Sequence, residues 1–383
     1  MILDEVQTLP TRLLKPLLSV FRELKENYGV SFLFMTATQP AFEKPENAPE
    51  TDLRWSKGTV TEVIEKPQEL FDSLKRVTLQ WPGRDNMPAK CTWDDVAGWI
   101  AAEPRSLCIT NMRNHAAILY HGLLSRGLDK SQVWYLTTRK CPKHRLDTIR
   151  AIRSALMRNG SICRVVSTQL VEAGVDLDFP VVFRAMGPLD SIAQAAGRCD
   201  REGKLTAATG RPAGRVIVFE PDIPANRSTP SGAYSDATTV TRTMAEGGAL
   251  SIHDVLHIRG YFNRYYQNDL DPDDIDALRS RLLFRTVSER AVVIDDPSTP
   301  VFVPYNDEAK ALIRELEKKG GGMDLFRRLQ RYQIGLYERE LDQAQKNGAV
   351  YEAIRDTGVW CCDERFYKND LGFMMESTDP LIA

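Results

Sequence analysis

Short apolar runs alternate with helix-forming segments between residues 105 and 221, and this alternation constrains the fold more than any other feature. The runs consist mainly of apolar residues, which is typical of strands buried on both faces. They lie at 107–110, 163–166, 181–183 and 216–219. Strands that alternate with helices predict a parallel sheet with helices on both faces, so we expect an α/β domain here.

A glutamine- and arginine-containing segment follows the third run. Gln194, Gly197, Arg198 and Arg201 form the pattern Q-x-x-G-R-x-x-R. On a helix, this spacing places the glutamine and both arginines on neighbouring positions of one face. Arginine keeps its charge and presents a planar fork of donors, which suits a phosphoryl group that gains charge during transfer. The segment therefore predicts a phosphate-binding helix, with a solvated basic helix start as the plainer alternative.

Three more motifs stand at the ends of apolar runs. They read D-E-V-Q at 4–7, T-A-T at 36–38 and S-T-Q-L-V-E-A-G-V-D at 167–176. A pair of carboxylates at a strand end can hold Mg²⁺ through one group and orient a water molecule with the other. The hydroxyl triplet has a plainer interpretation as helix-capping threonines.

In this order the four motifs resemble motifs II, III, V and VI of superfamily 2 helicases. The particular residues in these motifs resemble, more narrowly, those of the type I CRISPR-associated helicase-nuclease. The segments that carry this resemblance are D-E-V-Q at 4–7, T-A-T-Q-P at 36–40, T-R-K-C-P-K-H-R at 138–145 and Q-A-A-G-R at 194–198. The resemblance is close over 1–220 and diffuse beyond. Asp200 stands where the family pattern has asparagine, and we expect its charge beside the arginine pair to weaken phosphate contact slightly.

The resemblance implies an ATP- and Mg²⁺-dependent site between two RecA-like domains. Asp4 would help to hold Mg²⁺, and Glu5 would polarise the attacking water. Arg198 and Arg201 would approach from the second domain and stabilise the transferring γ-phosphoryl group. Domain closure on ATP and opening after hydrolysis would move the protein along a nucleic-acid strand.

The same resemblance assigns supporting roles. The residues expected to contact ATP or to sense its state are Gln194, Gly174, Asp176 and Gly197. The residues expected to couple nucleotide state to the nucleic acid are Gln7, Thr36 and Thr38. The residues expected to contact DNA are Asn111, Arg113, Arg139, Lys140, Ser167 and Thr168. A plain helix cap is the alternative for Asn111.

A basic stretch supports contact with single-stranded DNA. Residues 126–164 hold ten Lys or Arg against two Asp, although the whole chain has a net charge of −2. Phosphate contacts are independent of base sequence and depend steeply on salt. The stretch leads into residues 167 and 168, where hydroxyls and backbone amides could hold a phosphate. Solvated helix faces are the alternative for Arg150, Arg153 and Arg158.

A phosphate-cradling loop is missing from the sequence. ATPases of this class hold the β and γ phosphates with a G-x-x-x-x-G-K-[ST] loop. The segments S-K-G-T at 56–59 and G-K-L at 203–205 lack its order. Two hypotheses follow. The chain is the C-terminal part of an ATP-dependent DNA helicase or translocase of type I CRISPR antiviral defence. Alternatively, it is a truncated or split fragment that binds DNA or a partner without hydrolysing ATP.

Cysteine usage and hydropathy restrict the compartment. The seven cysteines form no C-x-x-C pair, so neither a zinc ribbon nor a disulfide framework is indicated. No apolar run approaches the roughly 18 residues needed to span a bilayer. We therefore expect a cytoplasmic protein with no membrane partner. The expected partners are single-stranded DNA, an RNA-guided CRISPR surveillance complex and the missing N-terminal helicase and nuclease portion.

The predicted fold is α/β, with a complete second RecA-like domain and parts on either side of it. The predicted segments are a remnant of the first RecA-like domain (1–45), a connector (46–104), the second RecA-like domain (105–221), a linker and helical segment (222–290) and a small α+β accessory domain (291–383). His253 and Asp254 are interpreted as part of a covering helix, because a nuclease of the HD type needs several clustered histidines.

Overall fold

A seven-stranded sheet forms the centre of the molecule, and every pairing in it is parallel. The computed structural model describes residues 1–46, 54–158, 160–172, 174–248, 250–267, 270–294 and 296–375. The strand order is β3-β9-β8-β5-β7-β6, and β4 also pairs with β9. The strands are β3 (Val77–Gln80), β4 (Lys90–Cys91), β5 (Arg105–Thr110), β6 (Val133–Leu136), β7 (Cys163–Thr168), β8 (Val181–Ala185) and β9 (Gly214–Pro221).

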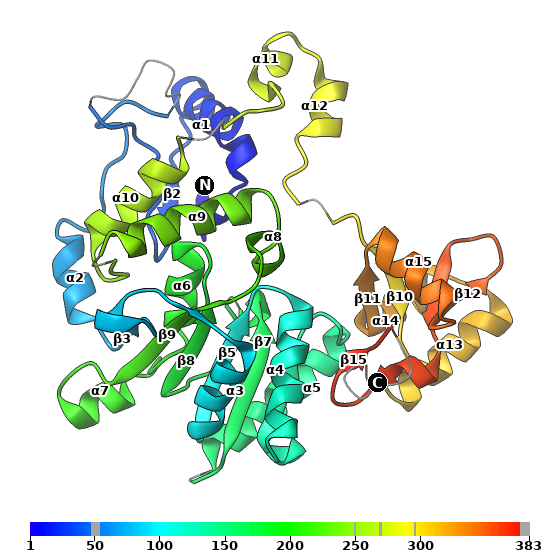
Figure 1. The fold of residues 1–383 in the computed structure, drawn as a ribbon. Coiled ribbons are helices and arrows are strands. Elements are labelled where there is room, and N and C mark those ends of the chain that lie inside the picture. Colours follow the sequence, from blue (N-terminus) through cyan, green and yellow to red (C-terminus); the bar gives the residue numbers. More distant parts are fainter. Residues whose placement is uncertain are drawn as a thin grey trace.

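Helices cover both faces of this sheet (Figure 1). They are α3 (Trp93–Ala102) and α4 (Arg113–Ser125) on one face, and α5 (Pro142–Met157) and α6 (Leu189–Ala196) on the other. Successive strand residues serve opposite faces. Cys108 and Val166 pack with α3 and α4, whereas Leu107 and Val165 pack with α5 and α6. Burial on both faces explains why these strands consist mainly of apolar residues.

The N-terminal residues form one β-α-β unit. Its elements are β1 (Ile2–Asp4), α1 (Leu14–Tyr28) and β2 (Leu33–Met35), and the two strands pair in parallel. The buried face of α1 includes Leu14, Leu18 and Phe21. Gly29 ends the helix in the left-handed conformation, with φ of 65°. The unit delivers the acidic motif at the end of β1.

Residues 46–104 contribute to the central sheet, although the sequence predicts a connector there. After α2 (Pro67–Ser73), β3 pairs with the beginning of β9 and β4 pairs with its end. The strands β3 and β4 have four and two residues, too few to establish a hydrophobic period. The domain that we expected to begin at residue 105 therefore begins at β3.

Residues 222–290 are mostly helical, which corrects the linker expected up to about residue 250. The helices are α8 (Ala225–Ser228), α9 (Ala233–Glu246), α10 (Val255–Tyr265), α11 (Ile275–Ser280) and α12 (Phe284–Arg290). The threonines of α9 explain the error. The hydroxyls of Thr238 and Thr241 donate to the carbonyls of Tyr234 and Ala237, four residues earlier. Because these bonds satisfy the hydroxyls inside the helix, a segment with linker-like composition is buried.

Helices α9 and α10 join the N-terminal unit to the central sheet (Figure 1). Leu18 of α1, Ile192 of α6, Ala237 of α9 and Phe262 of α10 belong to one continuous hydrophobic cluster. Trp55 lies in the same cluster, and its ring nitrogen donates to the Leu18 carbonyl at 3.2 Å. The acidic motif is therefore attached to the second domain by shared packing.

The last described residues form a small α+β accessory domain with its own hydrophobic core. Its four-stranded sheet has the order β11-β10-β13-β12. The elements are β10 (Thr299–Phe302), α13 (Asp307–Lys319), α14 (Met323–Leu329), β11 (Gln333–Leu336), α15 (Glu338–Lys346), β12 (Val350–Ile354), β13 (Val359–Cys362), β14 (Tyr367–Lys368) and β15 (Gly372–Phe373). Residues 291–294 connect α12 to this domain, with Ile294 exposed.

The accessory domain packs tightly on the loop between β6 and α5. A Cβ atom added to Gly372 would lie 2.4 Å from the Arg139 carbonyl oxygen, so only glycine permits this approach. The His144 ring stacks on Tyr305 with centroids 4.2 Å apart, and its Nδ1 lies 2.9 Å from the Tyr367 hydroxyl. Burial lowers the pKa of His144 to about 3, so this interface holds a neutral ring.

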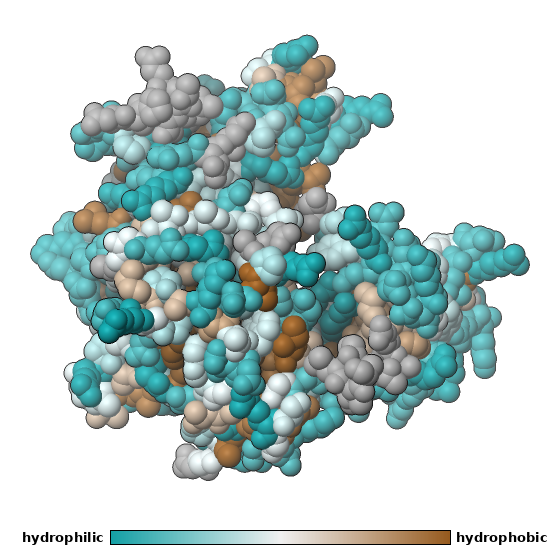
Figure 2. Space-filling model, in the orientation of Figure 1, coloured by the Kyte–Doolittle hydropathy of each residue, from teal (hydrophilic) through white to brown (hydrophobic). Residues whose placement is uncertain are grey.

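The molecular surface is mostly hydrophilic on the face drawn in Figure 2, with apolar residues in scattered patches. Over the described ranges, no helix is both long enough and apolar enough to cross a bilayer.

Candidate nucleotide site and nucleic-acid groove

The acidic motif forms a strained turn at the end of β1. Glu5 adopts a left-handed backbone conformation, with φ of 51°, and its N–H donates to Asp4 Oδ1 at 2.9 Å. Both side chains are exposed. A non-glycine residue in this region costs of order 1–3 kcal/mol, and such strain is found preferentially at functional positions. The turn presents two carboxylates at the carboxyl end of a parallel strand.

Hydrogen bonds connect this acidic pair to the hydroxyl triplet. Gln7 Nε2 donates to Glu5 Oε2 at 2.5 Å, and the Thr36 hydroxyl donates to Gln7 Oε1. The Thr38 N–H in turn donates to Thr36 Oγ1 at 3.0 Å. Gln7 is buried, whereas Glu5 is exposed, so this chain of bonds runs from the protein interior to the surface. Of the predicted coupling residues, Gln7 contacts the predicted catalytic carboxylate directly, and Thr36 and Thr38 are connected to it through Gln7.

The two arginines follow α6 and are not on it, which corrects the predicted arginine helix. α6 ends at Ala196, because Gly197 and the turn after it leave the helix. Arg198 is 8% exposed, and its Nε and Nη2 donate to the carbonyls of Val171 and Glu172 at 2.8 and 2.6 Å. The solvated alternative is therefore excluded for Arg198. Gln194 is half-buried on α6, and Gly197 is exposed.

Arg201 is the more accessible of the two arginines. Its side chain is 43% exposed, and its Nε lies 2.8 Å from Asp176 Oδ1. Gly174, two residues before Asp176, supplies a left-handed turn with φ of 69°. Burial lowers the pKa of Arg198, and so does the charge of Arg201, whereas Asp176, Glu172 and Glu5 raise it. The glutamate of the N-terminal unit therefore lies within electrostatic range of an arginine of the second domain.

Asp200 does not act on the arginine pair as expected. It is 1% exposed, and its two carboxylate oxygens accept from the N–H groups of Leu205 and Thr206, each at 2.9 Å. These amides belong to the first turn of α7 (Lys204–Thr209). The negative charge is thus used at a helix start, where it is favourable.

The acidic pair fits a magnesium ion in its donor chemistry. Mg²⁺ prefers oxygen ligands, keeps several waters and is usually bound by one or two carboxylates together with substrate phosphates. Asp4 and Glu5 supply this number of carboxylates. In the described part of the chain, no cluster of three or more metal-ligating side chains occurs. Metal binding here would therefore depend on the phosphates of a bound nucleotide.

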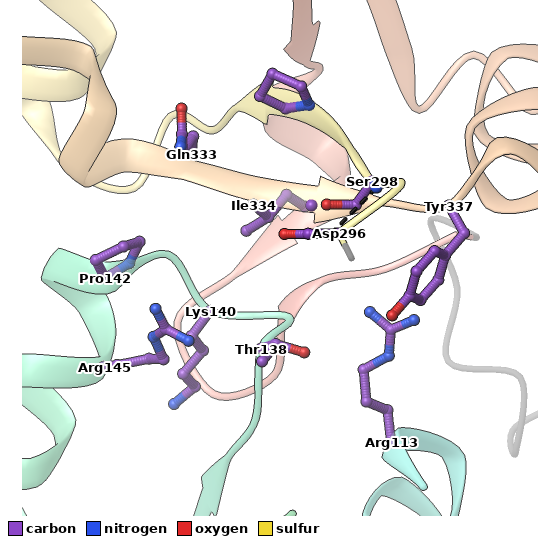
Figure 3. Close-up of a pocket in the computed structure, with 12 residues that line it drawn as sticks. Arg113, Thr138, Lys140, Pro142, Arg145, Asp296, Ser298, Gln333, Ile334 and Tyr337 are labelled. Atoms are coloured by element: carbon purple, nitrogen blue, oxygen red, sulfur yellow. Dashed lines mark hydrogen bonds between the residues drawn. The ribbon is translucent and has the colours of Figure 1, made fainter. Parts of the chain in front are cut away.

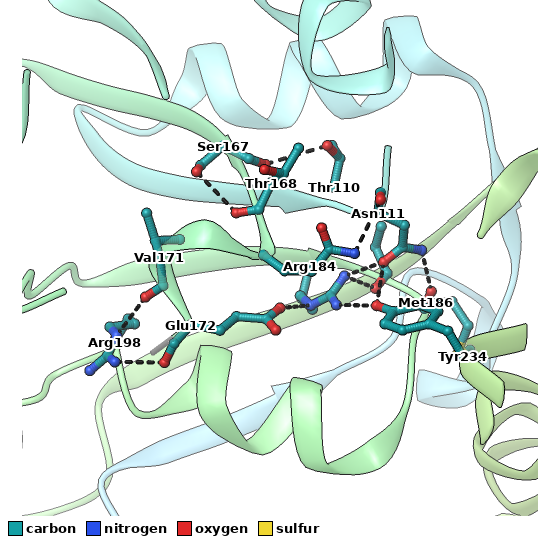
Figure 4. Close-up of polar contacts among 12 residues, drawn as sticks. Thr110, Asn111, Ser167, Thr168, Val171, Glu172, Arg184, Met186, Arg198 and Tyr234 are labelled. Atoms are coloured by element: carbon teal, nitrogen blue, oxygen red, sulfur yellow. Dashed lines mark hydrogen bonds and ion pairs between the residues drawn. The ribbon is translucent and has the colours of Figure 1, made fainter. Parts of the chain in front are cut away.

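Asn111, one of the predicted DNA-contacting residues, belongs to a buried polar network (Figure 4). Both N–H groups of the Asn111 amide are used, since it donates to the carbonyls of Met186 and Ser228 at 2.7 and 3.2 Å. Its Oδ1 accepts from Arg184 and from Tyr234, at 2.8 and 2.9 Å. The side chain of Asn111 consequently holds strand ends together and has no further donor for a phosphate.

Ser167 and Thr168 are also buried. The Ser167 hydroxyl donates to the carbonyl of Leu136 at 2.6 Å, across the β6–β7 pair. The sequence predicts these hydroxyls to hold a phosphate, whereas the structure places them inside the sheet end.

Arg184 and Glu172 form a fully buried ion pair that the sequence analysis missed. Arg184 Nε lies 2.9 Å from Glu172 Oε1, with side-chain exposures of 0% and 5%. Burial raises the pKa of Glu172 to about 6, against the opposing effect of Arg184. The backbone carbonyl of Glu172 also anchors Arg198. An arginine inside the apolar run V-V-F-R-A was the available signal, because a buried strand tolerates such a charge only when it is paired.

A pocket of about 430 Å³ separates the second domain from the accessory domain (Figure 3). Its lining includes three cations, Arg113, Lys140 and Arg145, and one acid, Asp296. Arg145 was not among the predicted contacts, although it lies in the T-R-K-C-P-K-H-R segment. Burial lowers the pKa of Lys140 to about 8, with Asp370 opposing. Arg113 and Arg139 both pair with Glu340 of α15 at the edge of this region.

Comparison with known proteins finds a family model that matches part of the second domain. Residues 103–204 match the family model described as CRISPR-associated nuclease/helicase Cas3, C-terminal. The Cas3 of Haloferax volcanii is 53% identical over 55 residues, which is 14% of this chain and 5% of that protein. The Cas3 of Methanothermobacter thermautotrophicus is 24% identical over 307 residues, 76% of this chain and 34% of that protein. The chain thus spans about a third of the length of the Methanothermobacter protein.

Solved structures show the fold. The crystal structure of T. fusca Cas3-ATP superimposes with a TM-score of 0.54 at 16% identity, over 89% of this chain and 48% of that one. The crystal structure of T. fusca Cas3 gives 0.51 at 18% identity, over 75% and 39%. The predicted RecA-like α/β fold is confirmed. In motifs, family match and fold, this chain is similar to the C-terminal helicase portion of the Cas3 helicase-nucleases.

Proposed function

We propose that this chain is the C-terminal part of an ATP-dependent DNA translocase of CRISPR defence, which acts on single-stranded DNA. The observation that carries the proposal is that Glu5, at the end of β1, lies within electrostatic range of Arg198 in the second domain, beside the turn that also carries Arg201. A phosphoryl-transfer site needs a group that orients the attacking nucleophile on one side and an arginine that stabilises the transferring phosphoryl group on the other. A relative with this fold is named as a complex with ATP, which supports a nucleotide here.

The proposed mechanism divides the work between the two units. Asp4 would hold Mg²⁺, which supplies charge neutralisation at the phosphates when bound. Glu5 would orient the attacking water, and Gln7 fixes the Glu5 carboxylate by its hydrogen bond. Arg201 would leave Asp176 to meet the γ-phosphoryl group, because its side chain is partly exposed and held by a solvent-facing carboxylate. Arg198, bound to two carbonyls, would keep the turn in place.

The chain needs a phosphate loop to complete this site. Its sequence contains no G-x-x-x-x-G-K-[ST] pattern. We therefore expect background ATP hydrolysis from the purified chain, and DNA-stimulated hydrolysis when a polypeptide carrying the preceding half of a related helicase is added. Hydrolysis by the chain alone would contradict this division of the site. If neither the chain alone nor the mixture hydrolyses ATP, although both bind DNA, the result would favour the second hypothesis, that the chain is a binding module.

The pocket between the domains is proposed to receive the DNA backbone. We expect Arg145→Ala to weaken binding of a labelled oligothymidylate about tenfold. The slope of the logarithm of the binding constant against the logarithm of the salt concentration should become shallower by about one, because one phosphate contact is lost. Arg150→Ala is the matched control, since Arg150 is exposed on the same helix and pairs with Asp147. Fluorescence anisotropy at several salt concentrations measures both quantities. An equal loss of DNA affinity in the two variants would indicate a general effect of positive charge and would exclude the pocket as the DNA-binding site.

Binding should also depend on pH through Lys140. Because burial lowers the pKa of this lysine to about 8, it loses its charge between pH 7 and 9. A charge-assisted hydrogen bond contributes about 1.5 kcal/mol or more, so DNA affinity should fall about tenfold over this interval. Lys140→Arg keeps the charge and should remove the pH dependence. The same pH dependence in both proteins would exclude Lys140 as its source.

The resemblance to Cas3 also supports a partner. We propose that the target DNA is delivered by an RNA-guided surveillance complex and that the cellular location is the cytoplasm. Co-purification of this chain with a DNA-bound surveillance complex of its own cell is the direct measurement.

A further inference from the structure

Two arginines from different strand ends meet at a single carboxylate. Arg113 begins α4 after β5, and Arg139 lies in the loop after β6. The Nη2 atoms of Arg113 and Arg139 lie 2.5 and 3.0 Å from the same atom, Glu340 Oε1. Glu340 belongs to the first turn of α15 in the accessory domain. Its side chain is 20% exposed, against 23% for Arg113 and 17% for Arg139.

The carboxylate satisfies these arginines incompletely. Its second oxygen, Oε2, accepts from the N–H of Tyr337 at 3.2 Å. One oxygen atom therefore serves two guanidinium groups. The Arg139 Nη1 atom is buried and has no hydrogen-bond partner among the described residues. One negative charge against two positive charges also leaves an excess of one. The pair of arginines retains capacity for an anion with more acceptor oxygens than Glu340 offers.

Aromatic rings hold the two guanidinium groups in position. The Tyr337 ring lies 5.7 Å from the Arg113 guanidinium carbon, and the Phe373 ring lies 5.5 Å from that of Arg139. Contacts on the faces leave the donor edges directed at the carboxylate. Figure 3 shows Arg113 beneath Tyr337 at one side of the pocket, with Lys140 at the other. The two-arginine position is therefore continuous with the cationic pocket.

We propose that Arg113 and Arg139 form a phosphodiester-binding site that Glu340 masks, and that the backbone of single-stranded DNA displaces this carboxylate. This inference rests on the proposed DNA-binding function. A phosphodiester carries the same charge as a carboxylate, and its two free oxygens can serve both arginines separately. The exchange preserves charge balance at the arginines and releases Glu340 to water. The accessory domain thereby sets the affinity threshold for DNA through an internal competitor.

Glu340→Gln tests the proposal with little structural disturbance. Glutamine has the same shape and can keep the bond from the Tyr337 N–H, since glutamate and glutamine both serve at this capping position. Glu338→Gln is the matched control, because Glu338 is exposed in the same helical turn and its loss changes net charge equally. A site that is nine-tenths masked has its apparent affinity reduced about tenfold. We expect Glu340→Gln to bind oligothymidylate about tenfold more tightly than Glu338→Gln.

The outcomes separate this inference from the function on which it rests. Equal or weaker binding by Glu340→Gln relative to Glu338→Gln, with wild-type binding intact, overturns the masking and leaves DNA binding standing. No binding by any of the three proteins overturns both. If Glu340→Gln does not fold, Glu340→Asp replaces it, because the shorter carboxylate withdraws from the arginines while keeping its charge. Tighter binding by Glu340→Asp supports masking, and unchanged binding overturns it.

Discussion

Arg201→Ala is expected to reduce DNA-stimulated ATP hydrolysis by about 10³- to 10⁵-fold, the usual contribution of an arginine finger. The measurement is steady-state turnover by the chain together with a supplied phosphate-loop half. Arg201 is 43% exposed and held by Asp176, so alanine removes a mobile charge and leaves no buried cavity. The loss should appear in kcat, because the arginine acts on charge that develops during transfer.

A matched variant separates this effect from a general loss of positive charge. Arg314→Ala removes an exposed arginine from α13 of the accessory domain and should leave turnover unchanged. Nucleotide affinity, measured with a fluorescent ATP analogue, should change little in Arg201→Ala. A fall in affinity without a fall in kcat would assign Arg201 to ground-state binding and contradict the proposed role.

Arg184→Met is expected to destabilise the fold by about 3–5 kcal/mol, because it leaves a buried carboxylate without its partner. Arg184 is completely buried and pairs with Glu172, whose side chain is 5% exposed. The same substitution removes a donor from Asn111 Oδ1, so the strand ends lose a second interaction. Urea denaturation of the variant and wild type gives the difference in free energy of unfolding. Arg314→Met on α13 is the control for the change in residue type.

The destabilisation should depend on pH in a defined direction. Burial raises the pKa of Glu172 to about 6 in the folded protein, above its ordinary value of 4.5. A neutral Glu172 therefore contributes to the free energy of unfolding. This contribution is complete below pH 4.5, the ordinary pKa, and is lost as the pH rises through about 6, the pKa in the folded protein. Without Arg184 the folded pKa rises further, so Arg184→Met should cost more at pH 8 than at pH 5. The double variant Glu172→Gln with Arg184→Met should remove this pH dependence, and a persistent dependence would exclude Glu172 as its source.

The strands of the second domain could be predicted because their physical signal is local. In β7, Val165 and Val166 are completely buried and pack on opposite faces of the sheet, so both neighbouring positions are apolar. The strand β4 has two residues, and only its pairing with β9 defines it. The helix α9 was missed because its threonines satisfy their hydroxyls on the preceding turn, which sequence composition does not reveal.

The residues of the candidate site also differ in whether a local sequence signal or a tertiary contact defines them. Asp4, Glu5 and Arg201 could be proposed as site residues because an acidic pair and a spaced arginine pattern are visible along the chain. The partners that determine how other residues act come from distant segments. Asn111 is engaged by Arg184, and Arg113 is engaged by Glu340, and neither pairing has a sequence period. Residue type therefore indicated which chemistry was present, and tertiary contacts decided which side chains remain accessible.

The single hydrophobic cluster that runs from α1 through α10 to α6 has a consequence for unfolding. The N-terminal unit and the central sheet share buried residues, whereas the accessory domain has a separate core. Segments that share a core lose it together, so the acidic motif and the arginine turn should melt in one cooperative transition. The accessory domain can lose its structure in a separate step. Partial denaturation would then release Glu340 from the arginines while the nucleotide-facing residues stay folded.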